Sequence, residues 1–227
     1  MNLSDLEKKL EISFKNKNLL REALTHRSYL NEHPDFSLSS NERLEFLGDA
    51  ILEFLISRLL FEQFPSFSEG ILTACRSKIV RTKTLSSLAK DFSLGEFLFL
   101  SKGEEEGGGR VNLGLLENAF EALLGAIFLD QGMEKADQFV KKHFLPLLRE
   151  IKPSELKDAK SLLQELAQEK EKITPTYKVI SGIGPDHAKI FTVGVFLGKK
   201  KIGEGKGVSK QEAEEEAAQK ALDRYVS

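Results

Sequence analysis

The sequence predicts a protein of two domains, in which an all-helical domain is followed by a small α+β domain. Two observations lead to this prediction. Apolar residues recur at helical spacing through most of residues 1–151, beginning with Leu3, Leu6 and Leu10. After Lys152-Pro153 the pattern changes, and residues 189–196 show the alternation that is typical of a strand. We therefore expect domains at 1–151 and 158–227, joined by a linker at 152–157.

The helices of the first domain follow from apolar periodicity and capping signals. The longest apolar stretch runs from Leu44 to Phe61 and is expected to form one helix. Ser39 and Glu42 have capping-box spacing, which predicts that this helix starts near residue 40. Residues 101–110 combine glycines with three consecutive glutamates, so we expect a mobile loop without regular structure there. Further helices are expected at 71–90, 114–130 and 134–150.

The second domain is expected to have the order α-β-β-β-α. Ser209 and Glu212 again have capping-box spacing, which places the start of the last helix near Ser209. A domain of this size that contains one sheet and two helices is a small α+β sandwich. The expected elements are a helix at 158–170, strands at 177–180, 189–196 and, briefly, 201–202, and the final helix.

Composition indicates a globular protein of the cytoplasm. The 227 residues are 41% hydrophobic, enough to fill ordinary cores, and the apolar runs are shorter than a bilayer requires. The N-terminal residues lack the apolar segment of a secretory signal, and the single Cys75 cannot form an internal disulfide. A net charge of -2 gives no global sign of nucleic-acid binding, although the second domain is mildly basic and the first acidic.

The most informative segment is the run Asn41-Glu42-Arg43-Leu44-Glu45-Phe46-Leu47-Gly48-Asp49. On a helix Glu45 and Asp49 lie one turn apart on the same face. Two carboxylates about 6 Å apart at an effective dielectric near 20 repel by roughly 3 kcal/mol, a cost that a divalent cation would reverse. The alternative interpretation is a solvated acidic face without a ligand.

This run resembles the signature of bacterial ribonuclease III. Residues 25–29, Thr-His-Arg-Ser-Tyr, resemble the family's early motif, and residues 118–123, Asn-Ala-Phe-Glu-Ala-Leu, resemble its second acidic motif. Residues 158–227 resemble its double-stranded-RNA-binding domain. The motifs occur in the family's order, so the resemblance covers the whole chain. It implies a homodimeric endonuclease that cuts both strands of duplex RNA to leave 5′-phosphates and short 3′ overhangs, in ribosomal precursor and messenger RNA.

The resemblance also implies a metal site. It assigns Mg²⁺, with Mn²⁺ as a substitute, to carboxylate and amide oxygens from two helices, and such oxygens are the ligands that Mg²⁺ prefers. The metal ligands would be Glu45, Asp49, Asn118 and Glu121, with Asp49 and Glu121 as catalytic residues. Glu42 and Glu69 would be nearby acidic positions. Phe46 would be a dimer contact, although an ordinary core residue is the alternative.

Asn118 departs from the family pattern, because the second acidic motif usually begins with Asp. An Asn oxygen can still bind a hard cation, but one negative charge is lost and metal affinity should fall. Glu117, the preceding residue, is a candidate for partial compensation; the alternative is a solvated surface Glu. The protein could instead be a regulator that binds duplex RNA with impaired catalysis. His26 is left out of the site, because the family uses metal-bound water as the nucleophile.

A third class, a carboxylate-bridged metal bundle with other chemistry, is disfavoured. Such sites usually carry Glu-x-x-His pairs, and none of the four histidines stands three residues after a Glu.

The second domain offers three elements for duplex RNA, which presents its shape, its 2′-hydroxyls and its phosphates to a protein. By resemblance, Gln164 and Gln168 on the first helix touch the minor groove, and the loop 184–187 between the first two strands enters the next minor groove. Backbone amides and a helix N-terminus beside the last helix would straddle phosphates with the two lysines there; a simple capped turn is the alternative. Gln211 and the acidic helix that follows should weaken this contact, which Lys199-Lys200-Lys201 could supplement. The RNA-binding residues would be Gln164, Gln168, Pro185, His187, Lys206 and Lys210.

Overall fold

The computed structural model describes residues 2–65, 67, 69–150, 159–185 and 189–226. The chain divides into two compact units, Met1–Ile151 and Lys152–Ser227, and each is described by itself. The expected linker at 152–157 and His187 lie outside the described residues. No helix of the described part is long and apolar enough to cross a membrane.

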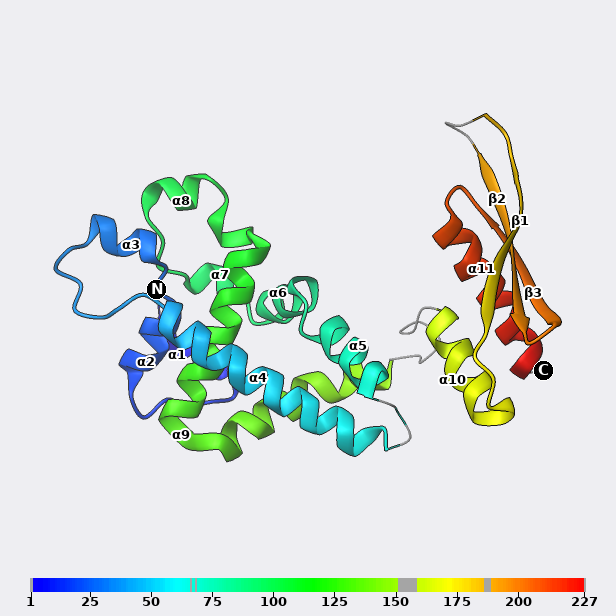
Figure 1. Ribbon diagram of the computed structural model, residues 1–227. Helices are drawn as coiled ribbons and strands as arrows, with labels where there is room; N and C mark the ends of the chain where they lie inside the picture. Colours follow the sequence, from blue (N-terminus) through cyan, green and yellow to red (C-terminus); the bar gives the residue numbers. More distant parts are fainter. Residues whose placement is uncertain (1, 66, 68, 151–158, 186–188, 227) are drawn as a thin grey trace. The chain divides into compact units, whose positions relative to one another are not determined.

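The first unit is helical, as predicted, and two long helices form its centre (Figure 1). These are α4 (Glu42–Gln63) and α9 (Leu113–Arg149). The others are α1 (Leu3–Leu10), α2 (Lys17–Ala23), α3 (Arg27–Glu32), α5 (Glu69–Ile79), α6 (Thr82–Asp91), α7 (Leu94–Phe97), α8 (Lys102–Glu106) and the 3₁₀ turn η1 (Gly109–Val111).

The core of this unit lies where α4 and α9 pack together. Leu52, Leu55 and Ile56 of α4 are fully buried, as are Phe120 and Leu123 of α9. These residues recur at helical spacing, so each helix turns an apolar stripe inward and leaves other faces for polar side chains. Burial of each such side chain contributes about 1.5–3 kcal/mol to folding.

Two glycines bring the backbones of α4 and α9 into direct contact. A Cβ atom at Gly48 would lie 1.8 Å from the carbonyl oxygen of Glu121, and one at Gly125 would lie 2.4 Å from the carbonyl oxygen of Leu44. Neither distance can accommodate a side chain, so the close approach depends on glycine at both positions. The crossing sets the backbone of Glu121 against the turn of α4 that carries Glu45 and Asp49.

The expected single helix at 71–90 is wrong, because α5 and α6 are separate helices. Arg81 has an extended backbone with φ −74° and ψ 154°, which interrupts helical geometry. Its carbonyl then accepts the amide of Thr84 at 2.8 Å and starts α6. Apolar spacing continues across the break, so periodicity did not reveal it.

The capping box predicted for the start of the signature helix is wrong, although the helix begins close to the expected residue 40. The helix begins at Glu42, with Asn41 as its N-cap. The amide of Asn41 donates to the carbonyl of Thr25 at 2.8 Å, and the Ser40 hydroxyl donates to the Glu42 carboxylate at 2.9 Å. These two contacts, rather than the predicted capping box between Ser39 and Glu42, fix the start of α4.

The segment 101–110 forms α8 and η1, contrary to the expectation of a loop without regular structure. The Ser101 hydroxyl accepts the amide of Glu104 at 3.1 Å and caps α8. Acidic residues in the first turn of α8 favour its N-terminus. Arg110 donates to the carbonyls of Gly95 at 2.8 Å and Leu98 at 3.1 Å, and it pairs with Glu105 at 2.7 Å. Arg110 thus anchors a segment whose composition alone favours a loop.

The helices expected at 114–130 and 134–150 are the two halves of α9. They meet at Gly132, whose φ of 82° and ψ of 179° produce a kink. Asp130, just before the kink, accepts the amides of Lys15 at 2.8 Å and Asn16 at 2.7 Å. The kink therefore faces the connection between α1 and α2.

The second unit has the predicted order of elements. It consists of α10 (Ala159–Glu171), β1 (Thr176–Ile183), β2 (Ile190–Leu197), β3 (Lys200–Gly207) and α11 (Lys210–Val226). The strands form an antiparallel sheet in the order β1-β2-β3. Leu163 of α10, Val195 of β2 and Ala217 of α11 belong to one buried cluster that joins the helices to the sheet.

The third strand is eight residues long rather than the brief strand expected at 201–202. Its glycines permit close packing on α11, since a Cβ at Gly203 would lie 2.4 Å from the Ala217 carbonyl oxygen and one at Gly205 would lie 2.2 Å from the Ala217 amide. Glycine usually disfavours strands, but here the tertiary contact requires it.

Candidate active site and RNA-binding surface

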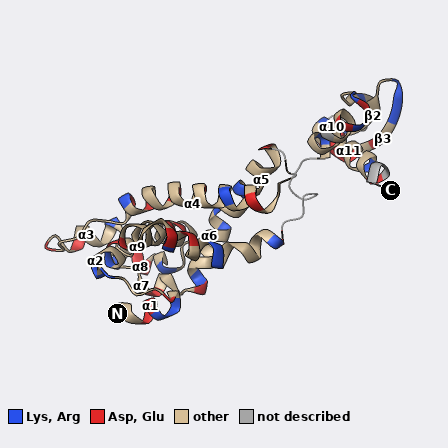
Figure 2. Cartoon of the chain, turned by 90° about the horizontal axis from the view of Figure 1, so that it is seen from below, with Lys and Arg blue, Asp and Glu red and all other residues tan. Residues whose placement is uncertain are grey.

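Acidic side chains from two helices meet at the crossing of α4 and α9. Glu45 and Asp49 flank Gly48 on α4, and Glu121 is the α9 residue whose backbone touches Gly48. Asp49 is exposed, while Glu45 and Glu121 are partly buried. Figure 2 shows basic and acidic residues interspersed along both units. The close backbone contact thus places Glu45 and Asp49 on the α4 side of the crossing and Glu121 on its α9 side.

The electrostatics of the crossing disfavour several negative charges. Burial raises the pKa of Glu121 to about 8, with further contributions from Asp49, Glu117, Glu45 and Glu53. The pKa of Glu45 is also raised, first by burial and then by Glu42, Glu117 and Asp49. A bound cation would favour the ionised carboxylates and offset this repulsion.

Glu121→Gln is expected to stabilise the metal-free protein in a pH-dependent way. A Glu in the unfolded chain has a pKa of 4.5, whereas folded Glu121 has a pKa of about 8. Glu121 therefore does not destabilise the folded state below about pH 4.5. Its destabilising effect grows between pH 4.5 and pH 8 and is complete above about pH 8. After allowance for solvent screening, the gain at high pH is on the order of 1–3 kcal/mol. Urea unfolding in EDTA from pH 4 to 9 measures it; a gain that does not change with pH would contradict the assignment.

The side chains at this crossing offer the oxygen ligands that a hard divalent cation such as Mg²⁺ prefers. Glu45, Asp49 and Glu121 offer carboxylate oxygens, and Asn118 adds an amide oxygen from the α9 turn before Glu121. Among the described residues, no three His, Cys, Asp or Glu side chains are close enough together to form a finished metal site. The carboxylates would have to move closer together to bind one cation. We call Glu45, Asp49 and Glu121, at the crossing of α4 and α9, the acidic crossing.

Glu117 belongs to the same electrostatic neighbourhood. It raises the pKa of Glu45 more than Asp49 does, and it raises the pKa of Glu121 more than Glu45 does. It lies one helical turn before Glu121 and is partly buried.

Glu53 is a member of this neighbourhood that sequence reasoning missed. It follows Asp49 by one turn of α4, contributes to the raised pKa of Glu121, and pairs with Arg76 of α5 at 2.7 Å. Arg76 also donates to the Ser57 hydroxyl at 2.9 Å. The four-residue spacing of Glu45, Asp49 and Glu53 could have indicated that Glu53 lies on the same face of α4. Its ion pair with Arg76 of α5 could not be predicted from the sequence.

A second face of α4 is apolar and exposed. Phe46 is 80% exposed, Phe54 56% and Phe61 72%, and their spacing places them along one stripe of the helix. The interpretation of Phe46 as an ordinary core residue is therefore wrong. Near the end of this stripe, a hollow of about 440 Å³ is lined partly by Phe61, Phe67 and Glu69.

The remaining acidic positions lie at helix starts. Glu42 is exposed in the first turn of α4 and lies 3.7 Å from Arg27. Glu69 is exposed at the first residue of α5, where it lines the hollow.

The early motif at 25–29 has a structural role. Thr25 is fully buried and receives the amide of Asn41, while the amide of His26 donates to the carbonyl of Phe99 at 3.0 Å. The His26 ring caps α3 by accepting the amide of Ser28. These contacts fix the start of α4, in agreement with leaving His26 out of the acidic site.

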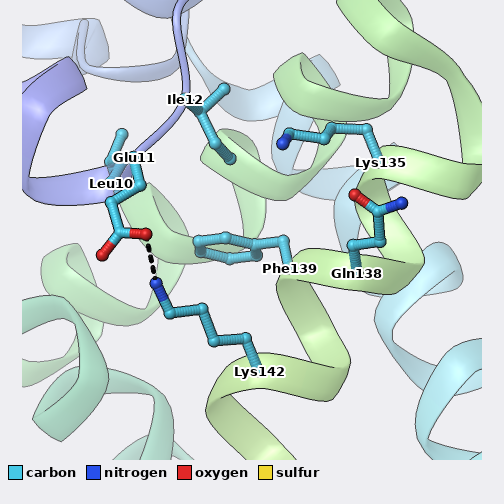
Figure 3. A pocket seen from close by; sticks show the side chains of 7 residues that line it. All are labelled: Leu10, Glu11, Ile12, Lys135, Gln138, Phe139 and Lys142. Carbon is cyan, nitrogen blue, oxygen red and sulfur yellow. Dashed lines mark ion pairs between the residues drawn. The ribbon is translucent and has the colours of Figure 1, made fainter.

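A separate cavity of about 150 Å³ lies between the end of α1 and the second half of α9 (Figure 3). Glu11 and Lys142 form an ion pair across it at 2.7 Å, beside the ring of Phe139. Its α9 residues follow the kink at Gly132, whereas Glu121 precedes it. This cavity is thus distinct from the acidic crossing.

The predicted RNA-binding residues of the second unit are largely exposed. Gln164 and Gln168 lie one turn apart on α10, and Pro185 follows β1. Lys206 is exposed near the end of β3, and Lys210 begins α11 with its ammonium 5.9 Å from the centre of the Phe191 ring.

The glycines before α11 form part of β3, and the turn that follows them carries the predicted capping box. The preceding glycines belong to β3 and pack on α11, so they do not form a free loop for phosphates. The Ser209 hydroxyl accepts the amide of Glu212 at 3.1 Å, and the Glu212 carboxylate accepts the amide of Val208 at 2.9 Å, which is the predicted capping box. The Glu216 carboxylate accepts the amide of Lys206.

Comparison with protein families matches both units. Residues 16–148 match the family described as Ribonuclease-III-like, and residues 159–225 match the double-stranded RNA binding motif. With the acidic crossing, these matches define a two-domain nuclease that carries a double-stranded-RNA-binding domain.

Full-length relatives are consistent with this class. The chain is 45% identical to Ribonuclease 3 of Roseiflexus sp. (strain RS-1), covering 97% of this chain and 94% of the relative. It is 46% identical to Ribonuclease 3 of Carboxydothermus hydrogenoformans, covering 98% and 95%. The nuclease domain of Campylobacter jejuni ribonuclease III superposes with a TM-score of 0.60 at 37% identity, covering 66% of this chain and 99% of that domain. The chain belongs to the ribonuclease III family, the double-stranded-RNA-specific endoribonucleases.

Proposed function

We propose that this protein is a Mg²⁺-dependent endoribonuclease that hydrolyses duplex RNA to 5′-phosphates with short 3′ overhangs. The proposal includes ribosomal precursor and messenger RNA as substrates and the cytoplasm as the site of action. The observation that carries it is the backbone contact between Gly48 and Glu121, which sets carboxylates of two helices against each other. Membership of the family supplies the reaction class.

In this proposal Glu45, Asp49, Asn118 and Glu121 would hold the cation, and Asp49 and Glu121 are the catalytic residues. When bound, Mg²⁺ would supply Lewis-acid charge beside the scissile phosphate and lower the pKa of water there. The carboxylates orient that charge through the rigid crossing at Gly48. Glu121, whose pKa is raised to about 8 in the metal-free protein, would hold the cation in its ionised form, so cation and proton would compete for its carboxylate.

Cleavage specificity tests the proposal. A labelled RNA duplex and its two separate strands are incubated with the protein and Mg²⁺, and the products are resolved at single-nucleotide length. We expect the duplex to be cut, with ends that carry 5′-phosphate and 3′ overhangs, and the single strands to remain intact. Equal cleavage of single strands would contradict the proposal.

We further propose that the protein acts as a homodimer through the exposed stripe of α4. Phe46, Phe54 and Phe61 are large apolar side chains exposed along one helix, and Phe61 also lines a hollow that could receive a partner's side chain. The nuclease domain of the Campylobacter jejuni relative has a region described as involved in dimer formation.

Phe46→Asp is expected to weaken the dimer by at least about 100-fold, because a carboxylate replaces a large apolar contact. Sedimentation equilibrium over a range of protein concentrations measures the change. Val111→Asp, at an exposed apolar residue outside α4, is the matched control and should leave the dimer intact. Equal association of both variants and the parent would show that Phe46 lies outside the interface.

Asn118→Asp is expected to lower the Mg²⁺ concentration needed for half-maximal cleavage by about three- to tenfold, because it adds a carboxylate to the site. Glu117→Ala should raise this concentration if Glu117 compensates for Asn118. Cleavage rates over a Mg²⁺ titration measure both effects. An unchanged requirement in Glu117→Ala would remove Glu117 from the proposed site, and an unchanged requirement in Asn118→Asp would remove position 118.

The second candidate is a regulator that binds duplex RNA with impaired catalysis, and Asn118 is the observation that favours it. Retention of Glu45, Asp49 and Glu121 at the crossing favours the active enzyme. The two candidates differ in whether bound duplex RNA is cut.

A further inference from the structure

The Glu216 carboxylate accepts a hydrogen bond from a backbone amide in the part of the second unit that is proposed to contact RNA. It lies in the second turn of α11, and its carboxylate accepts a hydrogen bond from the amide of Lys206 near the end of β3. The other oxygen of Glu216 lies 2.9 Å from the Lys220 ammonium. Glu216 is thus held by one backbone donor and one cation.

The charge of Glu216 acts on Lys206 as well. The hydrogen bond from the Lys206 amide, followed by the Lys220 hydrogen bond, keeps the pKa of Glu216 below its ordinary value, and the Lys206 side chain contributes to this effect. Glu216 is therefore ionised at neutral pH and partly cancels the positive field of Lys206.

A carboxylate and a phosphate use the same donors, namely backbone N–H groups and ammonium groups. A phosphate of duplex RNA that approaches Lys206 would meet an amide already occupied and a negative charge beside it. Lys210 is drawn toward the Phe191 ring, and the Val208 amide is occupied by Glu212. A phosphate that contacts this turn must therefore either displace one of these carboxylates from its amide or bind beside its negative charge.

We propose that Glu216 is a resident competitor of RNA phosphate, which lowers the affinity of the second unit for duplex RNA. This inference rests on the proposed function, because it assumes that RNA phosphate approaches Lys206. It assigns to Glu216 a role in setting affinity that is separate from the capping role of Glu212.

The test measures the affinity of the full chain for a labelled RNA duplex in EDTA, where binding is followed without added metal. We expect Glu216→Ala to bind about three- to tenfold tighter, with Glu216→Gln between it and the parent, because Gln keeps an acceptor but loses the charge. The salt dependence should become steeper if one more phosphate is contacted. In cleavage with Mg²⁺, KM should fall while kcat stays unchanged.

Glu204→Gln is the matched control. Glu204 also lies near Lys206, but it pairs with Lys201 at 2.7 Å, and its carboxylate is not the acceptor for the Lys206 amide. The control removes the same charge from the same neighbourhood and should change affinity by less than about twofold. Equal gains in Glu204→Gln and Glu216→Ala would overturn the inference, because net charge alone would explain them.

The outcomes separate this inference from the proposed function. If Lys206→Ala weakens binding while Glu216→Ala leaves it unchanged, the competitor role is wrong and the RNA-binding proposal stands. If the parent binds no duplex RNA, the proposed function and the inference both fail. A purely structural role for Glu216 would lower the unfolding free energy of Glu216→Ala without tightening RNA binding, which also overturns the inference.

Discussion

Asp49→Asn is expected to slow duplex-RNA cleavage by at least about 1,000-fold while the affinity for duplex RNA remains that of the parent. Asp49 is exposed beside Gly48, where α4 meets the backbone of Glu121. The substitution preserves shape but removes one of the three carboxylates proposed to hold the cation. A loss of this size corresponds to about 4 kcal/mol of transition-state stabilisation, within the range that a misplaced metal ion can cost. Single-turnover cleavage and binding in EDTA measure the two quantities.

Glu62→Gln is the control for Asp49→Asn. Glu62 lies near the other end of the same helix, exposed and 3.7 Å from Arg58, so the variant removes the same charge away from the crossing. It should cleave at close to the parent rate. Asp49→Asn with more than a tenth of the parent rate would exclude Asp49 from the catalytic residues.

Gly48→Ala is expected to destabilise the first unit by at least about 3 kcal/mol. The added Cβ would lie 1.8 Å from the Glu121 carbonyl oxygen, so two long helices would have to separate. Their separation would also move Glu121 away from Glu45 and Asp49. Urea unfolding measures the stability, and the cleavage rate of the folded fraction reports the effect on the site.

Gly70→Ala makes the same substitution inside α5, where no atom lies within 4 Å of the added Cβ. Because alanine favours helices, this control should be neutral or more stable by up to about 1 kcal/mol. Equal stabilities of the two variants would show that α4 and α9 do not approach as closely as described.

Elements with regular periodicity could be predicted from the sequence. The apolar spacing identified α4 and, as two separate helices, the two halves of α9, and the four-residue spacing of Glu45 and Asp49 placed them on one face. The order of elements in the second unit followed from alternation and from the capping box at Ser209. The association of Glu121 with this pair came only from the resemblance, because sequence spacing says nothing about which helices touch.

Features that depend on distant contacts could not be predicted. Glycines 48 and 125 gave no sign of the backbones that they approach. The break at Arg81 rests on the backbone dihedrals of one residue, α8 depends on Arg110, and β3 keeps its glycines because α11 lies against them. In α8 and β3, tertiary packing overrode the local preference of the residues.

The most direct test of the acidic crossing as a catalytic metal site is the metal dependence of cleavage by the parent protein. A long RNA duplex is incubated with Mg²⁺, with Ca²⁺ and with EDTA, and binding and cleavage are followed on gels. We predict binding under all three conditions and cleavage only with Mg²⁺, because the larger Ca²⁺ takes more ligands in looser geometry. Binding without cleavage under every condition, or equal cleavage in EDTA, would contradict the account.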